Sequence, residues 1–146
     1  MSFSRRMDCE ATPANLAALL AFVDQACQDA GLDEDTRFAV RLAGEEAICN
    51  IVHHAYEGMP PGPVSLHLYR DGAQVVLEVQ DRAPVFSPDD APPPDLSSDV
   101  NTRRLGGLGW HLIRQFMDEV RHEAVAGGGN RLALVKRMQP QPAPAP

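Results

Sequence analysis

Apolar residues recur at helical spacing near the start of the chain. Thr12 is the expected N-cap, Pro13 falls in the first turn and Gly31 ends the pattern, as is typical of helix boundaries. The apolar stripe between them comprises Leu16, Leu19, Leu20, Val23, Cys27 and Ala30. This stretch predicts a helix with one face against a core.

Two later stretches show the same spacing. The first begins near Asp33 and ends at the Gly58 to Pro63 break, and its apolar positions are Phe38, Leu42, Ile48, Val52 and Ala55. The second has apolar residues at Leu112, Ile113, Phe116, Met117 and Val120. We therefore expect a longer second helix and a third helix.

Alternation of apolar and polar residues predicts the strands. Val64, Leu66 and Leu68 alternate with polar residues, the pair Asp71-Gly72 follows, and Val75, Leu77 and Val79 then continue the alternation. This is the signature of a β-hairpin. Two more strands are expected at roughly 120–126 and 131–137, on either side of three glycines, and residues 3–10 give a weaker edge-strand pattern.

Together these elements predict an α/β (α+β) two-layer sandwich, with a mixed, mostly antiparallel sheet covered on one face by three helices. That arrangement buries every apolar stripe. The length of 146 residues suits one compact domain, which we expect at residues 1–138. The proline-rich stretch at about 84–105 predicts a lid over a site, and residues 139–146 predict a disordered tail.

Charge and composition exclude several classes of function. The 13 basic and 20 acidic residues give a net charge of −7, which argues against direct binding to nucleic acid. No apolar run approaches the roughly 20 residues needed to cross a bilayer, so we expect no membrane span. The three cysteines follow no metal-ligand or paired spacing and are typical of reduced thiols in a cytoplasmic protein.

Candidate chemistry gathers on the predicted second helix. Glu46 and Asn50 are four positions apart and share a face, which His53 or His54 extends by another turn. A solvated polar stripe is the plainer interpretation of such a triplet. Asp81 stands at the end of the hairpin, where an aspartate often only caps a turn.

A glycine cluster, Gly106-Gly107-Leu108-Gly109, precedes the predicted third helix. The unpaired N–H groups and the dipole at a helix N-terminus favour anions, and glycine lets an anion approach closely. The cluster therefore predicts a phosphate site. It has neither the Gly-Lys-Ser or Gly-Lys-Thr of a P-loop nor the preceding strand of a dinucleotide fingerprint.

Four stretches stand in a fixed order along the chain. They are Glu46 to Asn50 with His54 to Tyr56, Asp81 to Pro88, Gly106 to Gly109 with Leu112 and Ile113, and Met117 to Val120. Their order resembles the GHKL (histidine-kinase-like) ATPase family and, within it, the small anti-sigma factor serine/threonine kinases. The resemblance covers about residues 8–137 and implies the GHKL (Bergerat) ATP-binding fold, with ATP and Mg²⁺ as cofactors.

The resemblance also implies roles for individual residues. In the family, the residue that matches Asn50 coordinates Mg²⁺ and the one that matches Asp81 accepts a hydrogen bond from the adenine amino group. The residue that matches Glu46 is proposed to receive the proton of a serine hydroxyl during phosphoryl transfer. Further nucleotide-binding positions are expected at His53, Ala83, Arg104, Gly106, Gly107, Leu108, Gly109 and Asn130.

Some positions depart from the family pattern. Ala83 and Val85 stand where glycines are usual, and a positive φ at Ala83 would cost on the order of 1 kcal/mol. His53 replaces a common Lys or Arg, and Asn130 stands where many relatives have a threonine beside the adenine.

The function implied by the resemblance is a cytoplasmic partner-switching kinase. Such a protein phosphorylates a STAS-domain anti-anti-sigma protein and sequesters a sigma factor or another regulatory protein, and the resemblance also suggests a homodimer. A nucleotide-dependent binding module without kinase activity is the alternative. A histidine kinase fragment is a third hypothesis, disfavoured because His53 and His54 lie inside the expected nucleotide site.

Overall fold

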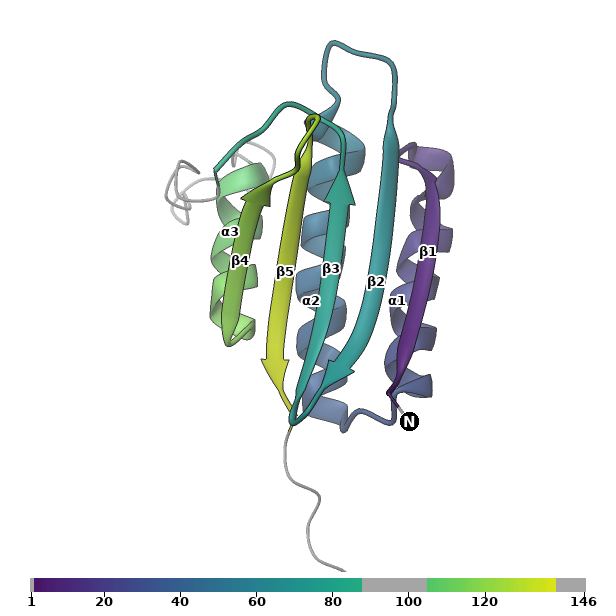
Figure 1. Ribbon diagram of the computed structural model, residues 1–146, viewed down its shortest axis with the longest axis vertical. Coiled ribbons are helices and arrows are strands. Elements are labelled where there is room, and N and C mark those ends of the chain that lie inside the picture. Colours follow the sequence, from purple (N-terminus) through teal and green to yellow (C-terminus); the bar gives the residue numbers. More distant parts are fainter. Residues whose placement is uncertain (1, 88–104, 139–146) are drawn as a thin grey trace, which may run out of the picture.

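A five-stranded sheet forms one layer of the molecule and the helices lie against one of its faces (Figure 1). The computed structural model describes residues 2–87 and 105–138, without the side chains of residues 105–108. The strands are β1 (Ser4–Glu10), β2 (Pro63–Asp71), β3 (Gln74–Asp81), β4 (Glu119–Ala124) and β5 (Asn130–Arg137). The predicted two-layer fold is confirmed.

The strand order is β1-β2-β3-β5-β4, and each of these neighbouring pairs is antiparallel. The sheet in the described residues is thus wholly antiparallel, where a mixed, mostly antiparallel sheet was expected. The reason is the β4–β5 hairpin, which places β5 between β3 and β4. The two strands joined through the third helix, β3 and β4, are therefore not neighbours.

Three α-helices in the described residues make up the second layer: α1 (Leu16–Asp29), α2 (Glu34–Asn50) and α3 (Leu105–Phe116). A 3₁₀ turn, Pro13–Asn15, precedes α1. Asp33 caps α2 by accepting a hydrogen bond from the Thr36 N–H at 3.0 Å, as the sequence predicts for a helix that begins there.

The helix ends differ from the prediction in two places that matter for function. The second helix does not continue as an α-helix to Ala55, because Ile51–Ala55 forms a wider π-helical turn. The third helix begins at Leu105, so the glycine cluster lies inside its first turns rather than before it. Its packing against α2 outweighs the low helix propensity of glycine. Val120 belongs to β4, and Phe38 is 55% exposed rather than part of the core.

The core lies between the sheet and the helices. Leu66 and Leu68 of β2 pair with Val79 and Leu77 of β3, and their side chains are buried, as the alternation predicts. The turn between these strands contains Gly72 at φ 60°. The largest fully buried side chains of the helices are Leu19, Val23, Val40, Ile48 and Ile113.

One turn beside the end of β3 requires glycine. Gly127, Gly128 and Gly129 have φ of 91°, 109° and 116° between β4 and β5, a region that L side chains rarely adopt. A Cβ at Gly129 would also collide with the Asp81 carbonyl oxygen. This turn allows Asn130, the first residue of β5, to pair directly with Asp81.

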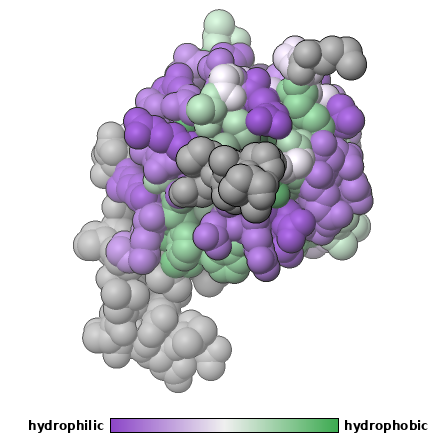
Figure 2. Space-filling model, turned by 90° about the horizontal axis from the view of Figure 1, so that it is seen from below, coloured by the Kyte–Doolittle hydropathy of each residue, from purple (hydrophilic) through white to green (hydrophobic). Residues whose placement is uncertain are grey.

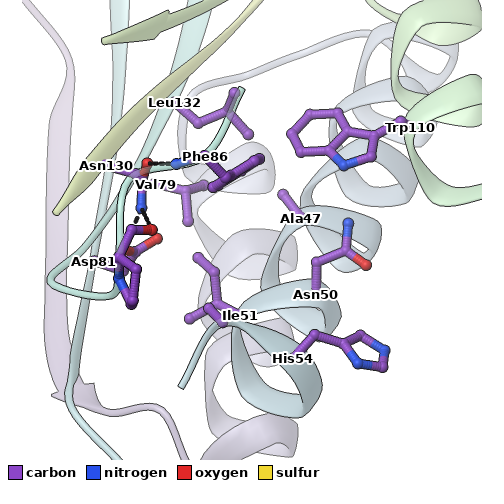
Figure 3. A pocket seen from close by; sticks show the side chains of 12 residues that line it. Ala47, Asn50, Ile51, His54, Val79, Asp81, Phe86, Trp110, Asn130 and Leu132 are labelled. Atoms are coloured by element: carbon purple, nitrogen blue, oxygen red, sulfur yellow. Dashed lines mark hydrogen bonds between the residues drawn. The ribbon is translucent and has the colours of Figure 1, made fainter. Parts of the chain in front are cut away.

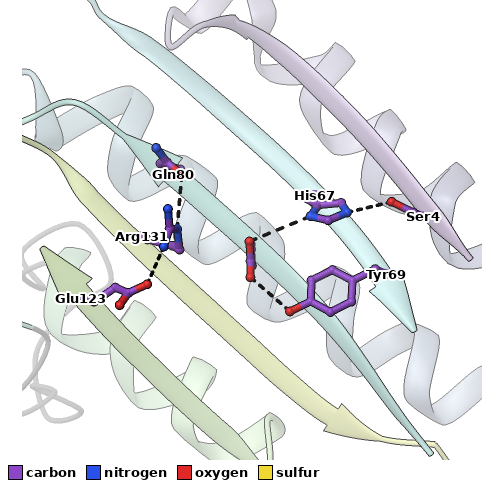
Figure 4. Close-up of polar contacts among 7 residues, drawn as sticks. Ser4, His67, Tyr69, Gln80, Glu123 and Arg131 are labelled. Carbon is purple, nitrogen blue, oxygen red and sulfur yellow. Dashed lines mark hydrogen bonds and ion pairs between the residues drawn. The ribbon is translucent and has the colours of Figure 1, made fainter. Parts of the chain in front are cut away.

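The sheet face away from the helices carries polar contacts (Figure 4). Tyr69 donates a hydrogen bond to Glu78 at 3.1 Å, and Arg131 donates to Glu123 at 2.6 Å. The surface seen from below is mostly hydrophilic, with smaller apolar areas (Figure 2). None of the described helices has the length and apolarity required to cross a membrane.

Candidate functional site

A cavity of about 340 Å³ opens between the C-terminal end of α2, the helix α3 and the ends of β3 and β5 (Figure 3). Its apolar lining residues are Ala47, Ile51, Ala55, Val79, Pro84, Phe86, Trp110 and Leu132. Its polar ones are Asn50, His54, Asp81 and Asn130. Apolar walls with a few fixed polar groups, at about 300–1,000 Å³, are typical of a small-molecule site.

Asp81 defines one end of the cavity. Its side chain is buried, and its Oδ1 accepts hydrogen bonds from the Ala83 N–H at 2.9 Å and from Asn130 Nδ2 at 3.0 Å. Burial raises the pKa of this carboxyl, and the bonds from Asn130 and Ala83 act in the opposite direction. An ionised carboxylate only accepts hydrogen bonds, so this end of the cavity selects a ligand that presents an N–H donor.

Glu46 and Asn50 approach Gly109 beside the other end of the cavity. A Cβ built at Gly109 would lie 3.0 Å from Glu46 Oε2 and 3.5 Å from Asn50 Nδ2. A side chain at residue 109 would therefore press on the Glu46 carboxylate, and glycine leaves that carboxylate in place. Burial, and secondly the charge of Glu45, raise the pKa of Glu46, which makes its carboxylate a stronger proton acceptor.

The amide of Asn50 is available to a ligand. Its Nδ2 is buried and has no hydrogen-bond partner among the described residues, a situation that is costly unless something outside the protein completes it. The same amide offers a neutral oxygen, the donor type that hard divalent cations prefer. No cluster of three or more His, Cys, Asp or Glu in the described part of the chain could hold a metal alone. A cation bound here would therefore be coordinated by the Asn50 amide oxygen together with phosphate oxygens and water.

The N-terminus of α3 supplies the remaining feature. The helix begins at Leu105 in the described residues. N–H groups in the first turn of a helix have no partner within the helix, and the helix dipole favours negative charge there. The site thus offers a carboxylate that can accept a hydrogen bond from a nucleobase, an amide oxygen for a cation and N–H groups for phosphates. These groups fit a nucleoside triphosphate with a divalent cation.

Comparison with known proteins gives the family. Residues 9–136 match the family described as the histidine kinase-like ATPase domain. The chain belongs to this family. It is 30% identical over 105 residues to the serine/threonine-protein kinase BtrW of Bordetella bronchiseptica, over 72% of this chain and 73% of BtrW.

Other relatives of this histidine kinase-like ATPase are named as serine kinases or anti-sigma factors. The serine-protein kinase RsbW of Halalkalibacterium halodurans is 34% identical over 68% of this chain and 62% of its own length, so less than two thirds of that protein is matched. The anti-sigma F factor of Anoxybacillus flavithermus is 29% identical over 81% of this chain and 78% of its own. The predicted kinship with serine/threonine kinases and anti-sigma factors is confirmed.

A solved structure supports the fold. The crystal structure of the RsbU and RsbW domains of a Mycobacterium tuberculosis protein superimposes with a TM-score of 0.66, at 18% identity, over 94% of this chain and 33% of that chain. The family match identifies the chain as an ATPase-type domain that uses ATP.

The histidine kinase-like fold brings the predicted residues together in two groups. Glu46, Asn50 and Gly109 meet where α2 and α3 approach each other, and Asp81, Ala83 and Asn130 meet where β3 ends. Ala83 is buried, and no described residue other than glycine has a positive φ. The strain considered for Ala83 is therefore absent.

Other predicted residues lie elsewhere or are not described. His53 is exposed and does not line the cavity, whereas His54 does. Gly106, Gly107 and Leu108 lie within the first turns of α3, whose side-chain surroundings are outside the description. Arg104, most of the predicted lid and the tail from residue 139 also lie outside the described residues. The roles assigned to these positions stay predictions.

Several functional neighbours escaped the sequence prediction. Phe86 and Trp110 line the cavity and are in contact, with ring centroids 5.7 Å apart, and the centroid of the His122 ring lies 5.1 Å from that of Phe86. Alternation along β4 could have placed His122 on the side of Val120, but nothing local indicates a contact with Asn130. Tyr56, recognised only as part of a motif, donates to the Pro63 carbonyl at 2.7 Å and accepts from the Arg82 N–H at 2.8 Å.

Proposed function

We propose that this chain is an ATP- and Mg²⁺-dependent protein serine/threonine kinase that acts by partner switching in the cytoplasm. In this proposal it phosphorylates a serine of a STAS-domain anti-anti-sigma protein and sequesters a sigma factor or another regulatory protein. The observation that carries the proposal is the approach of Glu46 and Asn50 to Gly109, beside a cavity that ends at Asp81. The names of the relatives, which include a serine-protein kinase and an anti-sigma F factor, support the class of partner.

The adenine base would occupy the apolar part of the cavity. Val79, Ile51 and Leu132 provide apolar contacts, and the ionised Asp81 accepts a hydrogen bond from the 6-amino group. Guanine carries a carbonyl oxygen at that position, and two acceptors facing each other repel. Asp81 therefore favours ATP over GTP.

The phosphates would lie toward α3. The free N–H groups in the first turn of α3 would bind phosphate oxygens, and the Asn50 amide oxygen would hold Mg²⁺. A bound magnesium ion neutralises phosphate charge as the γ-phosphoryl group is transferred. The Asn50 Nδ2, which has no partner among the described residues, would then donate to a phosphate oxygen.

Glu46 would receive the proton of the attacking serine hydroxyl. A general base contributes about 10²- to 10⁴-fold to rate, whereas positioning and charge neutralisation contribute the larger part of phosphoryl transfer. The raised pKa of Glu46 follows from burial. The neighbouring Glu45 is exposed and lies about 100° around the helix, so it is the poorer candidate.

Transfer of radiolabel from [γ-³²P]ATP to a STAS-domain protein tests this function. Label should reach a serine with the native chain, fall by about 10²-fold or more with Glu46→Gln, and change little with the matched control Glu45→Gln. Tight ATP binding without label on any STAS-domain partner would instead support the nucleotide-dependent switch. The proposed homodimer is tested separately by light scattering of the purified chain.

A further inference from the structure

Both the nitrogen and the oxygen of the Asn130 side-chain amide form hydrogen bonds with other groups of the protein (Figure 3). The residue is 1% exposed. Its Nδ2 donates to Asp81 Oδ1 at 3.0 Å and to the Pro84 carbonyl at 3.1 Å. Its Oδ1 accepts from the Phe86 N–H at 3.1 Å and lies 2.8 Å from His122 Nε2.

These partners fix the orientation of the amide and of the histidine. The Phe86 N–H can only donate, so the amide oxygen must face it. His122 Nε2 contacts the same oxygen and must therefore carry the proton in this arrangement. The two N–H groups and two lone pairs of Asn130 are then all occupied, and no hydrogen-bonding group is left for a ligand.

The effect of Asn130 is exerted on Asp81. The hydrogen bonds from Asn130 Nδ2 and the Ala83 N–H both end on Oδ1 of the Asp81 carboxylate, and the backbone N–H of Asn130 also stabilises its charge. These contacts fix the plane of the carboxylate, and Oδ2 is the oxygen offered to a donor in the cavity. The same amide holds residues 84–86 at the cavity, through the Pro84 carbonyl and the Phe86 N–H.

We propose that Asn130, held in place by His122, is a positioning residue for adenine recognition, which acts through the Asp81 carboxylate and does not touch the base. The inference rests on the proposed ATP site and replaces the direct adenine contact expected from the resemblance. Asn130 also joins base recognition to the backbone of residues 84–86. Loss of the Asn130 side chain should therefore weaken the hydrogen bond between Asp81 and the base and also shift Phe86.

The position of Phe86 has its own spectroscopic signal. Trp110 is the single tryptophan of the chain, and its ring centroid lies 5.7 Å from that of Phe86. Release of the Phe86 N–H from Asn130 should change the surroundings of Trp110. The intrinsic fluorescence of the ligand-free protein should report this.

Binding of two nucleotides by calorimetry tests the proposal. ATP and purine riboside triphosphate differ by the 6-amino group, so their affinity ratio isolates the bond to Asp81. We expect the native chain to prefer ATP by roughly 10- to 100-fold, the usual effect of a hydrogen bond to a charged group. In Asn130→Ala the ratio should fall to below about threefold, with altered Trp110 emission. His122→Phe, which keeps an aromatic ring beside Phe86, should lower the ratio partway, and Gln25→Ala, which removes an exposed amide bond on α1, should leave it unchanged.

The outcomes separate this inference from the proposed function. If Asn130→Ala weakens both nucleotides equally and keeps the native ratio, Asn130 is only structural and the inference is wrong. If Asn130→Ala does not fold, an unchanged ratio in His122→Phe overturns it. A native chain that binds ATP with no preference over purine riboside triphosphate overturns it as well. Failure of the native chain to bind either nucleotide would instead refute the proposed function, on which the inference depends.

Discussion

Gly109 of α3 and Glu46 of α2 approach so closely that a Cβ at residue 109 would lie 3.0 Å from Glu46 Oε2. The atom in the way is the far end of a flexible side chain, so a methyl group would displace the carboxylate rather than the backbone. The missing side chain therefore sets the position of the proposed base. The packing of Gly109 against Glu46 is independent of any phosphate binding by the glycine cluster.

Gly109→Ala should reduce phosphoryl transfer more than it reduces ATP binding. A displacement of the base by a fraction of an ångström is expected to lower kcat by roughly 10- to 100-fold. Stability should be unchanged or higher, since alanine favours a helix over glycine by about 1 kcal/mol. Radiolabel transfer, calorimetry and thermal unfolding measure the three effects. Gln115→Ala, an exposed position of the same helix, is the control, and equal transfer rates in the two variants would contradict the prediction.

Asp81→Asn should weaken ATP binding without lowering stability at pH 7. Burial raises the folded-state pKa of Asp81 above its ordinary value of 3.8, so the fold loses stability as pH rises through the interval between these two values. Above that interval the full cost of the buried charge is present, and the amide variant avoids it. An asparagine oxygen still accepts from the Ala83 and Asn130 donors.

Thermal unfolding at two pH values checks the sign. At pH 7 the Asp81→Asn variant should melt at the same temperature as the native chain or higher, and below pH 3.8 the difference should vanish. ATP affinity of the native chain should fall as acidification protonates Asp81. A variant that is less stable at pH 7 but not at low pH would show that the sign is wrong.

Asn50→Ala should abolish the magnesium dependence of ATP binding and leave the fold intact. The Nδ2 of Asn50 has no protein partner among the described residues, so its removal costs no intramolecular hydrogen bond there. Affinity for Mg-ATP should drop by at least about tenfold, the effect of roughly 1.4 kcal/mol, while affinity in EDTA should hardly change. Asn15→Ala, which loses only a bond to the Glu10 carbonyl, is the control. Equal Mg-ATP affinity in both variants would count against the cation site.

Tyr56→Phe should destabilise the cavity wall. The hydroxyl joins the Pro63 carbonyl to the Arg82 N–H, and its loss leaves both groups without this partner, at an expected cost of about 1–2 kcal/mol in urea unfolding. Because Arg82 follows Asp81, ATP affinity should fall too. Tyr69→Phe removes a hydroxyl contact on the far face of the sheet and should leave ATP affinity unchanged. If both variants bind ATP like the native chain, Tyr56 has no part in shaping the site.

The fold was predictable because its signals are local. The alternation at Val64, Leu66 and Leu68, with glycine in the turn that follows, is enough to place the hairpin and its buried face. The start of α3 was not predictable in this way. Glycines at Gly106 and Gly107 disfavour a helix by themselves, and the contact between α3 and α2 is not visible in the local sequence.

In the candidate site, too, local spacing predicts some contacts and not others. Glu46 and Asn50 share a helix face, so their spacing alone brings them together. The contact of Asn130 with Asp81 and His122 depends on strand register and on the glycine turn before β5, which composition does not specify. Aromatic side chains such as Trp110 occur in cores as well as in cavities, so the sequence pattern could not assign that residue to a cavity.

The π-helical turn at Ile51–Ala55 has a consequence for sequence alignment. A π turn closes its hydrogen bonds over one more residue than an α turn, so an ungapped alignment with a relative that has an ordinary helix here pairs side chains pointing in different directions. The basic residue that such a relative carries opposite His53 would then correspond in space to His54. Positional conservation in this stretch should accordingly be scored after structural superposition, with a one-residue offset permitted.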